Sequence, residues 1–440
     1  MKRIKQFFKF QPFSKKQRMV LNWWTDGSPV KECEGIIADG AIRSGKTVCM
    51  SLSFVMWAMS TFNGQNFAMC GKTIGSFRRN VLFWLKLMLK SRGYRVTDHR
   101  ADNLVVISRG DVENNFYVFG GKDERSQDLI QGITLAGVFF DEVALMPESF
   151  VNQATGRCSV DGSKYWFNCN PDGPNHWFKK NWIDNRKAKR LLYLHFTMDD
   201  NPSLTEKIKA RYRAMYVGIF YARYIEGRWA MAEGAIYDMF DENVHVIDHI
   251  PELEGPWYIS CDFGIQNATV FLLWRRKKGT NTWVCTNQYR YSGREKKVQK
   301  SVKQLIDGME ETFGLSSDEY DTEKICPRNI IVDPSASALI VELRQRGYSV
   351  RKAKNDVLNG IADVQVMLKD GRLLFLKRCC KETIEEIQGY RWDEKKAERG
   401  EDAPVKEADH SCDAIRYFVK TMKLVNRDDT EDDNEYEFYL

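Results

Sequence analysis

The octapeptide GAIRSGKT occupies positions Gly40–Thr47 of this chain. It follows an apolar run, Cys33–Asp39, and precedes a longer apolar run, Val48–Met59. A G-x-x-x-x-G-K-[ST] pattern between a strand and a helix is typical of a phosphate-binding loop. Its glycines let consecutive backbone N–H groups at the helix N-terminus wrap around phosphate oxygens. The spacing therefore predicts a strand, a nucleotide-binding loop and a helix, in that order.

The residue types in this loop indicate separate roles. We expect Lys46 to contact the outer phosphates of a nucleoside triphosphate and Thr47 to ligate its Mg²⁺ ion. Upstream of the first strand, the amide of Gln17 is a hypothesis for adenine recognition. The loop residues assigned by the motif alone are Gly40, Ser44 and Gly45.

A second motif supports the same site. The apolar run Leu135–Phe140 ends directly before Asp141 and Glu142. We expect Asp141 to hold Mg²⁺, directly or through water, and Glu142 to polarise the attacking water as general base. An adjacent Asp-Glu pair favours a motor-type ATPase over a kinase or a signalling GTPase.

A third polar segment follows the strand-like run Tyr165–Phe167. It reads NCNP, and the amide of Asn170 is placed to contact the γ-phosphate and to report its loss. The alternative is an Asn-Pro turn with no such role, which the spacing alone supports equally well.

Apolar runs that alternate with helical patterns predict an α/β fold with a mostly parallel sheet for the first half. The expected strands there are Cys33–Asp39, Asn66–Cys70, Gly137–Phe140, Lys164–Asn168 and Leu191–Phe196. A helical stretch, Lys207–Trp229, leads into the segment Ala232–Glu254, where we place a domain boundary. Expected strands beyond it are Trp257–Asp262, Val270–Arg275, Trp283–Tyr291 and Asn329–Asp333. Helical patterns cover Glu295–Phe313 and dominate from Ser337 onward.

Carboxylates in the second half form a possible metal site. Asp262 and Asp333 each close an apolar strand, and Asp409 and Asp413 lie one helical turn apart in the sequence ADHSCDAIRYFV. His410 shares their helix face. Two Mg²⁺ or Mn²⁺ ions held by such oxygens can stabilise the attacking and leaving oxygens of phosphodiester hydrolysis. The alternatives are strand-end turns for the first two acids and a helix N-cap for Asp409.

Composition sets the broad class. A chain of 440 residues with 43% hydrophobic residues predicts two or three globular domains. The net charge of +6 becomes +13 without the acidic stretch Asp428–Leu440, which favours a polyanionic partner such as nucleic acid. The 11 cysteines show no metal-ligand spacing and suit free, buried thiols in a reducing compartment. We expect no membrane segment and a cytosolic location.

Taken together, these motifs resemble the large subunit of tailed-phage terminases, and most closely the PBSX-type family. The resemblance spans nearly the whole chain. The segments that carry it are GAIRSGKT, VFFDE, NCNPDGPNHW, YIEGRWAMAEGAIYDMFD, SCDFG, VDPSAS and DHSCDAIRYF. It implies a P-loop ATPase domain of the ASCE, RecA-like type, over residues 1–235 with a helical linker subdomain. An RNase H-like nuclease domain would follow over residues 236–427, with an acidic, disordered tail at 428–440.

The resemblance also implies roles for individual residues. Arg43 matches the arginine of the family's phosphate loop, and Asn170 matches its coupling motif. A trans-acting arginine is implied as well, with three candidates open. The candidates are Arg78, Arg79 and Arg157. The implied ATPase residues are Lys46, Thr47, Asp141 and Glu142, and the implied nuclease metal ligands are Asp262, Asp333 and Asp413, with His410 beside them and Asp409 in the least certain role.

The implied cofactors are ATP with Mg²⁺ and two divalent ions. The implied partners are double-stranded DNA, the portal protein of the procapsid, the terminase small subunit and further copies of the chain in a ring on the portal. The implied location is the cytoplasm of the bacterial host. Two alternatives stay open: an ATP-switched DNA-binding or assembly protein, and a helicase or repair ATPase fused to an RNase H-like nuclease. Glu142 opposes the switch, because a switch needs no efficient base.

Overall fold

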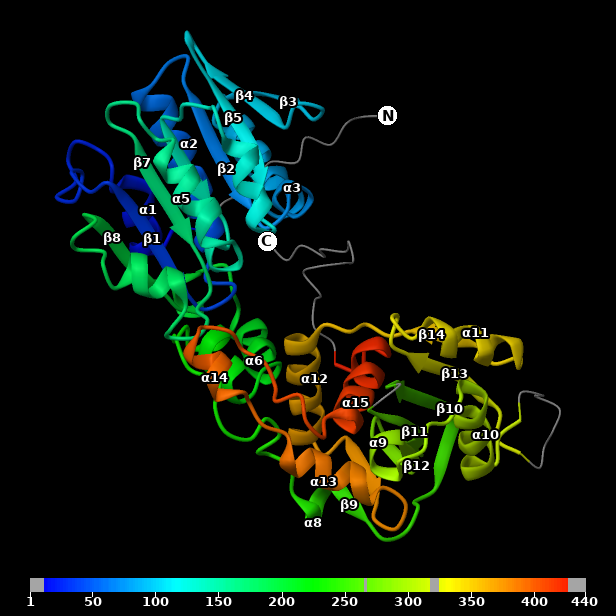
Figure 1. Ribbon diagram of the computed structural model, residues 1–440. Coiled ribbons are helices and arrows are strands. Elements are labelled where there is room, and N and C mark those ends of the chain that lie inside the picture. Colours follow the sequence, from blue (N-terminus) through cyan, green and yellow to red (C-terminus); the bar gives the residue numbers. More distant parts are fainter. Residues whose placement is uncertain (1–11, 265–266, 317–323, 426–440) are drawn as a thin grey trace, which may run out of the picture. The chain divides into compact units, whose positions relative to one another are not determined.

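The computed structural model describes residues 12–264, 267–316 and 324–425. The chain divides into two compact units. The described residues up to Arg213, with Gly218–Met231, form the first unit, and Ala214–Val217 with the described residues from Ala232 onward form the second (Figure 1). Each unit contains its own sheet, which confirms the α/β class. The functional boundary at residues 235 and 236 stays a prediction, and the expected tail, 428–440, lies outside the described residues.

The first unit is built on an eight-stranded sheet in the order β3-β4-β5-β2-β6-β7-β1-β8. From β5 to β8 every neighbouring pair is parallel, while β3, β4 and β5 pair antiparallel. The strands are β1 Gly35–Gly40, β2 Asn66–Gly71, β3 Arg95–His99, β4 Leu104–Arg109, β5 Val112–Gly120, β6 Gly137–Phe140, β7 Lys164–Asn168 and β8 Leu191–Phe196.

Helices cover both faces of this sheet. The apolar helix α2 packs on one face, where Phe54 and Phe139 belong to the same buried cluster. On the opposite face Phe150 of α5 packs against Phe140 and Phe167. The side chains of Phe139 and Phe140 point to opposite faces because successive strand residues alternate. The α-helices of this unit are α1 Lys15–Asn22, α2 Lys46–Thr61, α3 Ile74–Phe77, α4 Phe83–Ser91, α5 Glu148–Gly156, α6 Glu206–Ala214 and α7 Gly218–Phe220.

Two expectations for this unit were wrong in part. The antiparallel strands β3 and β4, and the parallel strand β5, were not expected. The stretch expected to be helical as far as Trp229 ends earlier: α6 and α7 are followed by a single π-helical turn, Tyr221–Ile225. The residues after Glu226 are irregular. The π-helical turn itself contacts the phosphate loop, because the backbone N–H of Ile42 donates to the Tyr224 carbonyl.

The second unit contains a seven-stranded mixed sheet in the order β14-β13-β10-β11-β12-β15-β9. The expected meander is present, since β10, β11 and β12 pair antiparallel. The other pairs are parallel. The strands are β9 Val246–Ile247, β10 Leu253–Asp262, β11 Ala268–Lys277, β12 Trp283–Ser292, β13 Pro327–Val332, β14 Val350–Lys352 and β15 Leu373–Leu376.

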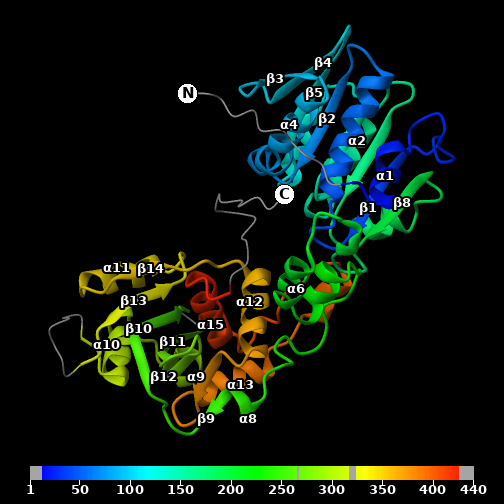
Figure 2. The same cartoon turned by 180° about the vertical axis from the view of Figure 1, so that it is seen from behind.

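Alternation along β10 decides which way its final carboxylate points. Ile259 and Cys261 belong to the core under α10 and α11. Tyr258 lies on the other face, beside Phe418 of α15. Asp262 shares the parity of Tyr258 and therefore faces α15. The helices are α8 Glu242–His245, α9 Gly293–Lys296, α10 Val302–Phe313, α11 Ser337–Gln345, α12 Val357–Lys369, α13 Lys381–Gly389, α14 Glu394–Glu398 and α15 His410–Thr421 (Figure 2).

The region after Ser337 is less purely helical than expected, because β14 and β15 extend the sheet on its two sides. The eleven cysteines are free thiols, as expected, and Cys49, Cys70, Cys169 and Cys261 are buried. No helix in the described ranges combines the length and apolar character that a membrane crossing needs.

Candidate functional site

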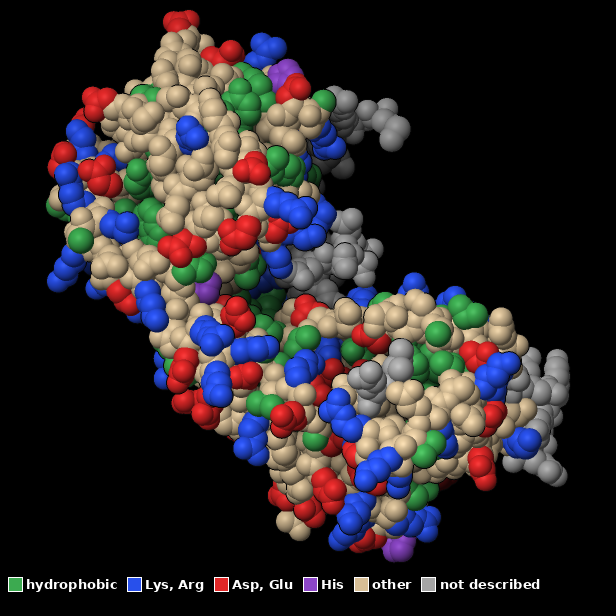
Figure 3. Space-filling view, viewed as in Figure 1, with side chains coloured by type: hydrophobic (Ala, Val, Ile, Leu, Met, Phe, Trp, Pro, Cys, Tyr) green, Lys and Arg blue, Asp and Glu red, His purple; other side chains and the backbone are tan. Residues whose placement is uncertain are grey.

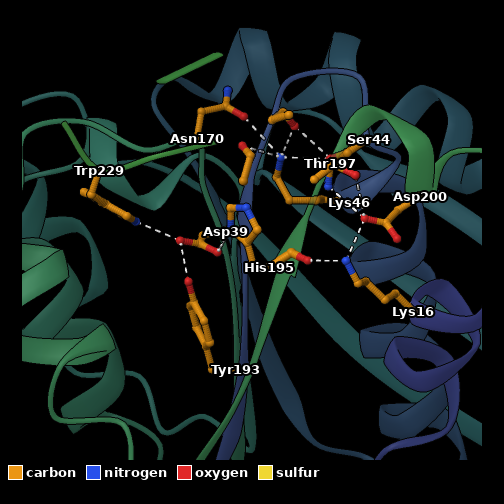
Figure 4. A network of polar contacts seen from close by, with 12 residues as sticks. Lys16, Asp39, Ser44, Lys46, Asn170, Tyr193, His195, Thr197, Asp200 and Trp229 are labelled. Atoms are coloured by element: carbon orange, nitrogen blue, oxygen red, sulfur yellow. Dashed lines mark hydrogen bonds and ion pairs between the residues drawn. The ribbon is translucent and has the colours of Figure 1, made fainter. Parts of the chain in front are cut away.

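Lys46, the lysine of the phosphate loop, lies at the start of α2, at the carboxyl edge of the first sheet. Its Nζ donates to the carbonyls of Gly40 and Ala41 at 3.1 and 2.6 Å, and to Ser44 Oγ at 3.1 Å. It also donates to Asn170 Oδ1 at 3.2 Å (Figure 4). Burial lowers the pKa of Lys46 to about 8, because the surroundings of its ammonium are poor in solvent. An anion bound beside Lys46 would therefore favour the charged form of its side chain.

The expected Mg²⁺ ligands of the first unit are brought together. Thr47 Oγ1 donates to Asp141 Oδ1 at 3.0 Å, although these residues begin α2 and follow β6. Asn168, at the end of β7, donates to the same carboxylate oxygen at 2.8 Å. Burial raises the pKa of Asp141, while the hydrogen bonds from Asn168 and Thr47 act in the opposite direction. A hydroxyl and a carboxylate in direct contact fit an Mg²⁺ ion, which prefers oxygen ligands.

The proposed general base has an unusual backbone. Glu142 adopts φ of 60° and ψ of 47°, the left-handed region that non-glycine residues rarely occupy. Its N–H donates to Asn168 Oδ1 at 2.9 Å, so the Asn168 amide links Asp141 and Glu142 in this geometry. The Glu142 side chain is exposed. Backbone strain of this kind is found at functional sites when the surroundings enforce it.

Two glycines of the loop have no substitute. A Cβ on Gly40, whose φ is +124°, would lie 2.0 Å from the Phe196 carbonyl oxygen. A Cβ on Gly45, whose φ is +82°, would lie 2.5 Å from Gln17 Nε2. Gln17 is buried, and its Oε1 accepts from the Ser14 N–H at 3.0 Å in a helix-capping arrangement. The glutamine therefore packs against the loop, but adenine recognition stays a prediction.

A buried network under the loop was not expected from the sequence. Asp39 of β1 has no exposed surface. Its Oδ2 accepts from Tyr193 Oη at 3.0 Å and from Trp229 Nε1 at 2.7 Å, and its Oδ1 lies 3.0 Å from His195 Nδ1 (Figure 4). Asp39 and His195 are register partners on β1 and β8. The only sequence signal was a charged residue at the end of an apolar strand.

The arginines implied by the resemblance differ in their surroundings. Arg43 adopts φ of 57°, and its guanidinium lies 5.4 Å from the ring centre of Tyr212. Arg78 is held in an ion pair with Asp98 at 2.7 Å. Arg157 is half-buried at the end of α5, and Arg79 is exposed. The identity of the trans-acting arginine stays a prediction.

In the second unit, the expected strand-end acids lie side by side. Cys261 of β10 pairs with Val332 of β13, so Asp262 and Asp333 come next on adjacent parallel strands. The His410 Nδ1 atom, at the start of α15, lies 2.8 Å from Asp262 Oδ2. Burial raises the pKa of Asp262, and the hydrogen bond to Asp262 raises the pKa of His410.

The α15 acids have cationic partners. Lys406 Nζ lies 3.1 Å from Asp409 Oδ2 and 3.4 Å from Asp413 Oδ2. Arg416 Nη2 donates to Asp413 Oδ1 at 2.8 Å. Burial lowers the pKa of Lys406, but the charges of Asp413 and Asp409 outweigh this effect and the pKa is raised. A protein ammonium group therefore bridges two acids that were expected to face metal ions.

Asp333, the strand-end acid after β13, is held by hydrogen bonds. Asp333 Oδ2 accepts from Tyr417 Oη at 2.8 Å, and its Oδ1 accepts from the Ser335 N–H at 2.7 Å. Burial raises the pKa of Asp333, but these hydrogen bonds prevail and the pKa is lowered. Within residues 12–425, where described, no three His, Cys, Asp or Glu side chains are already gathered as a metal site.

The residues nevertheless fit divalent ions. Asp262 is mostly buried and its ionised form is disfavoured, in part by the nearby charge of Asp413, so a cation would stabilise both acids. The Lys406 side chain is 57% exposed and can leave the acids without unpacking a core. Glu386 of α13 fixes the start of α15, because its Oε2 accepts a hydrogen bond from the N–H of Ser411 in the first turn of that helix. None of Lys406, Arg416, Tyr417 and Glu386 was expected.

Comparisons with known proteins point to one family. Residues 37–244 match the family described as "Terminase large subunit, T4likevirus-type, N-terminal". A curated terminase large subunit of Escherichia phage T5 is 25% identical over 274 residues. That match covers 58% of this chain and 56% of the relative, so it spans about half of the relative's length. The PBSX-type assignment stays a prediction.

Solved structures with similar sequences are also known. The large terminase of a thermophilic bacteriophage is 57% identical, with a TM-score of 0.83, and the match covers 94% of this chain and 100% of that chain. A structure of the same phage's large terminase in complex with ATP-gamma-S is 55% identical, with a TM-score of 0.79, and the match covers 93% and 98% of the two chains.

Proposed function

Because the chain belongs to the family of phage terminase large subunits, we propose that it hydrolyses ATP to move double-stranded DNA into a procapsid and cuts that DNA with its second unit. The observation that supports this proposal is that one chain holds two groups of side chains suited to phosphate chemistry. The contact between Thr47 and Asp141 marks the first site. The adjacent strand ends at Asp262 and Asp333 mark the second.

In the first unit, ATP would bind with its outer phosphates at Lys46. The ammonium group exchanges its carbonyl acceptors for phosphate oxygens, and Thr47 with Asp141 would hold the Mg²⁺ ion. Glu142 accepts a proton from the attacking water, since it follows Asp141 at the same sheet edge. The Asn170 amide accepts a hydrogen bond from Lys46 in the free protein. Loss of the γ-phosphate would therefore change the partners of Lys46 and, through this hydrogen bond, the position of the Asn170 side chain. This gives Asn170 its proposed coupling role.

In the second unit, Asp262, Asp333 and Asp413 would hold two Mg²⁺ or Mn²⁺ ions, with Asp409 and His410 in support. When bound, such ions supply charge stabilisation for an oxygen that attacks or leaves phosphorus. The contribution of the chain is to align these acids: Tyr417 orients Asp333, Arg416 orients Asp413, and His410 orients Asp262. Lys406 balances the acids until the ions bind.

The partners of this activity follow from the family. We infer double-stranded DNA as substrate, and the portal protein, the terminase small subunit and further copies of this chain as assembly partners. The work takes place in the cytoplasm of the bacterial host. The basic balance of the chain suits a polyanionic substrate.

The ATPase assignment is tested with two substitutions in the full chain. Lys46→Ala should weaken nucleotide binding, measured by calorimetry, because it removes the ammonium that faces the phosphates. Glu142→Gln keeps the size of the side chain but removes the base, so binding should persist while turnover falls at least about 10²-fold. Normal hydrolysis by folded Glu142→Gln would remove the proposed base.

The nuclease assignment is tested by cleavage of plasmid DNA. We expect cutting with Mg²⁺ or Mn²⁺ that stops when EDTA is added. Cleavage that continues in EDTA, or that occurs with neither ion, would contradict the two-ion proposal.

A further inference from the structure

A positively charged segment begins at the same sheet edge as the nuclease carboxylates. Strand register establishes this: Asp262 pairs with Val270 on β11, and Val270 pairs with Arg290 on β12. Neighbouring strands lie about 4.8 Å apart, so two spacings, about 10 Å, separate the backbones of Asp262 and Arg290. Strands β10 and β12 run in the same direction. The chain therefore leaves β12 at the edge where β10 ends.

We name residues 290–303 the basic segment. Its only acid, Glu295, is paired with Arg290 at 2.7 Å. Four of its cations have exposed side chains, and in the described part of the chain none of these four side chains has a hydrogen bond or an ion pair. The four are Arg294, Lys296, Lys297 and Lys303. In Figure 3, Lys and Arg side chains lie on the surface over α9, which belongs to this segment.

The segment is shaped by contacts of its own. Tyr291 Oη donates to the Val298 carbonyl at 2.8 Å. Lys300 Nζ donates to Tyr289 Oη at 3.1 Å and lies 4.5 Å from the ring centre of Tyr291. Arg290 Nε lies 3.6 Å from Glu386 Oε1, and Glu386 accepts a hydrogen bond from the first turn of α15. The basic segment is thus tied to the helix that carries Asp413.

A further cation lies on the other side of the strand-end acids Asp262 and Asp333 from the basic segment. Lys352 of β14 is exposed and pairs with Val332, the residue before Asp333. Four strand spacings separate β14 from β12, which is about 19 Å. A span of that size matches one minor and one major groove of duplex DNA, about 6 and 12 Å wide. Positive charge therefore lies on both sides of the acids along this edge, and by alternation Lys352 shares the sheet face of Val332 rather than that of Asp262.

We propose that the basic segment binds the phosphate backbone of duplex DNA and holds the strand to be cut against the Asp262 and Asp333 edge. This rests on the proposed nuclease function. A row of carboxylates repels a polyanion, so DNA reaches it only if nearby cations supply attraction. Exposed lysines and arginines without protein partners suit sequence-independent phosphate contacts, because each contact releases condensed counterions from the DNA.

The test compares two triple variants of the full chain. The first, Arg294→Gln with Lys296→Gln and Lys303→Gln, removes three charges from the basic segment. The control, Lys277→Gln with Lys324→Gln and Lys369→Gln, removes three charges beside the opposite edge of the same sheet, next to the end of β11 and the starts of β13 and β15. Binding to a fluorescent duplex is measured in EDTA from about 50 to 200 mM salt.

We expect the first variant to bind duplex DNA about 10- to 100-fold more weakly, with the slope of log K against log salt reduced by about 0.9 for each lost phosphate contact. The control should stay within about twofold of wild type. In cleavage assays the KM for DNA should rise in the first variant more than kcat falls. ATPase activity without DNA should be unchanged, which also reports a folded chain.

Three results overturn the inference. If wild type binds and cuts DNA while the first variant has the same affinity and the same salt slope, the basic segment is not a DNA contact and the proposed function stands. An equal loss of DNA affinity in both triple variants would also show that the basic segment is not a specific DNA contact, because the loss would then come from the change in net charge. If wild type itself neither binds nor cuts duplex DNA, the proposed function fails together with the inference.

Discussion

Nucleotide binding should draw a proton onto Lys46 at alkaline pH. In the free protein burial lowers the pKa of Lys46 from 10.5 to about 8. Bound phosphates add negative charge and should return that pKa toward its usual value. At pH 9 binding should therefore take up about 0.9 proton per site, against about 0.1 at pH 7. Protonating Lys46 at pH 9 costs about 1.4 kcal/mol, so the affinity should be about tenfold lower than at pH 7.

Two other groups near the Lys46 ammonium do not titrate in this range. Burial raises the pKa of Cys49 to about 12, so its thiol keeps its proton at pH 9. The terminal phosphate of the nucleotide loses its last proton at about pH 6.

The lowered pKa of Lys46 also affects the stability of the folded protein. Between about pH 8 and 10.5 the unfolded chain binds more protons at Lys46 than the native chain does, so the nucleotide-free protein should gain stability as the pH rises through that window.

The assay is titration calorimetry with ATP in buffers of different ionisation enthalpy. The dependence of the observed heat on the buffer gives the number of protons taken up. A matched control is Lys46→Arg, whose guanidinium stays charged at pH 9, so any residual binding should take up no proton. Wild-type heats at pH 9 that are independent of the buffer would contradict the expected proton uptake, because Lys46 would then be charged before the nucleotide arrives.

Further predictions concern single side chains. Asp413→Asn should abolish DNA cleavage while ATPase activity and folding persist, whereas Asp409→Asn should be milder in a plasmid assay; equal damage from both would mean that the ligand role is shared. Lys406→Gln removes the ammonium that bridges these acids, so Mn²⁺ affinity measured by calorimetry should rise, and an unchanged affinity would show that Lys406 does not compete with metal. Alanine substitution of the trans-acting arginine, tried in turn at Arg78, Arg79 and Arg157, should lower ATP turnover in the assembled motor and leave nucleotide binding by the single chain unchanged; normal turnover in all three variants would exclude these candidates.

Much of the fold was predictable because polar residues follow apolar strands at one sheet edge. The runs that end at Phe140, Asn168 and Asp262 are strands as expected. The side chains expected at the first site also meet, since Thr47 and Asp141 are in contact. Carboxyl ends of parallel strands share an edge, and that rule needs no knowledge of the packing.

Other features depend on contacts between distant residues. Asp39 is paired with Trp229, and Lys406 with Asp413, through side chains whose meeting no local pattern specifies. The strands β14 and β15 are short, with 3 and 4 residues, so neither contains enough of a strand pattern to be told from the helices around it. The trans-acting arginine is open for a similar reason, because its proposed target would lie on another copy of the chain.

We propose that one chain carries two independent phosphate chemistries, and a crossed assay can separate them. ATP hydrolysis and plasmid cleavage are measured on folded Glu142→Gln and folded Asp262→Asn. We predict that the first variant loses ATP hydrolysis and still cuts DNA with Mn²⁺, and that the second loses cutting and still hydrolyses ATP. If either substitution abolished both activities, or if neither activity responded to its own substitution, the claim would be contradicted.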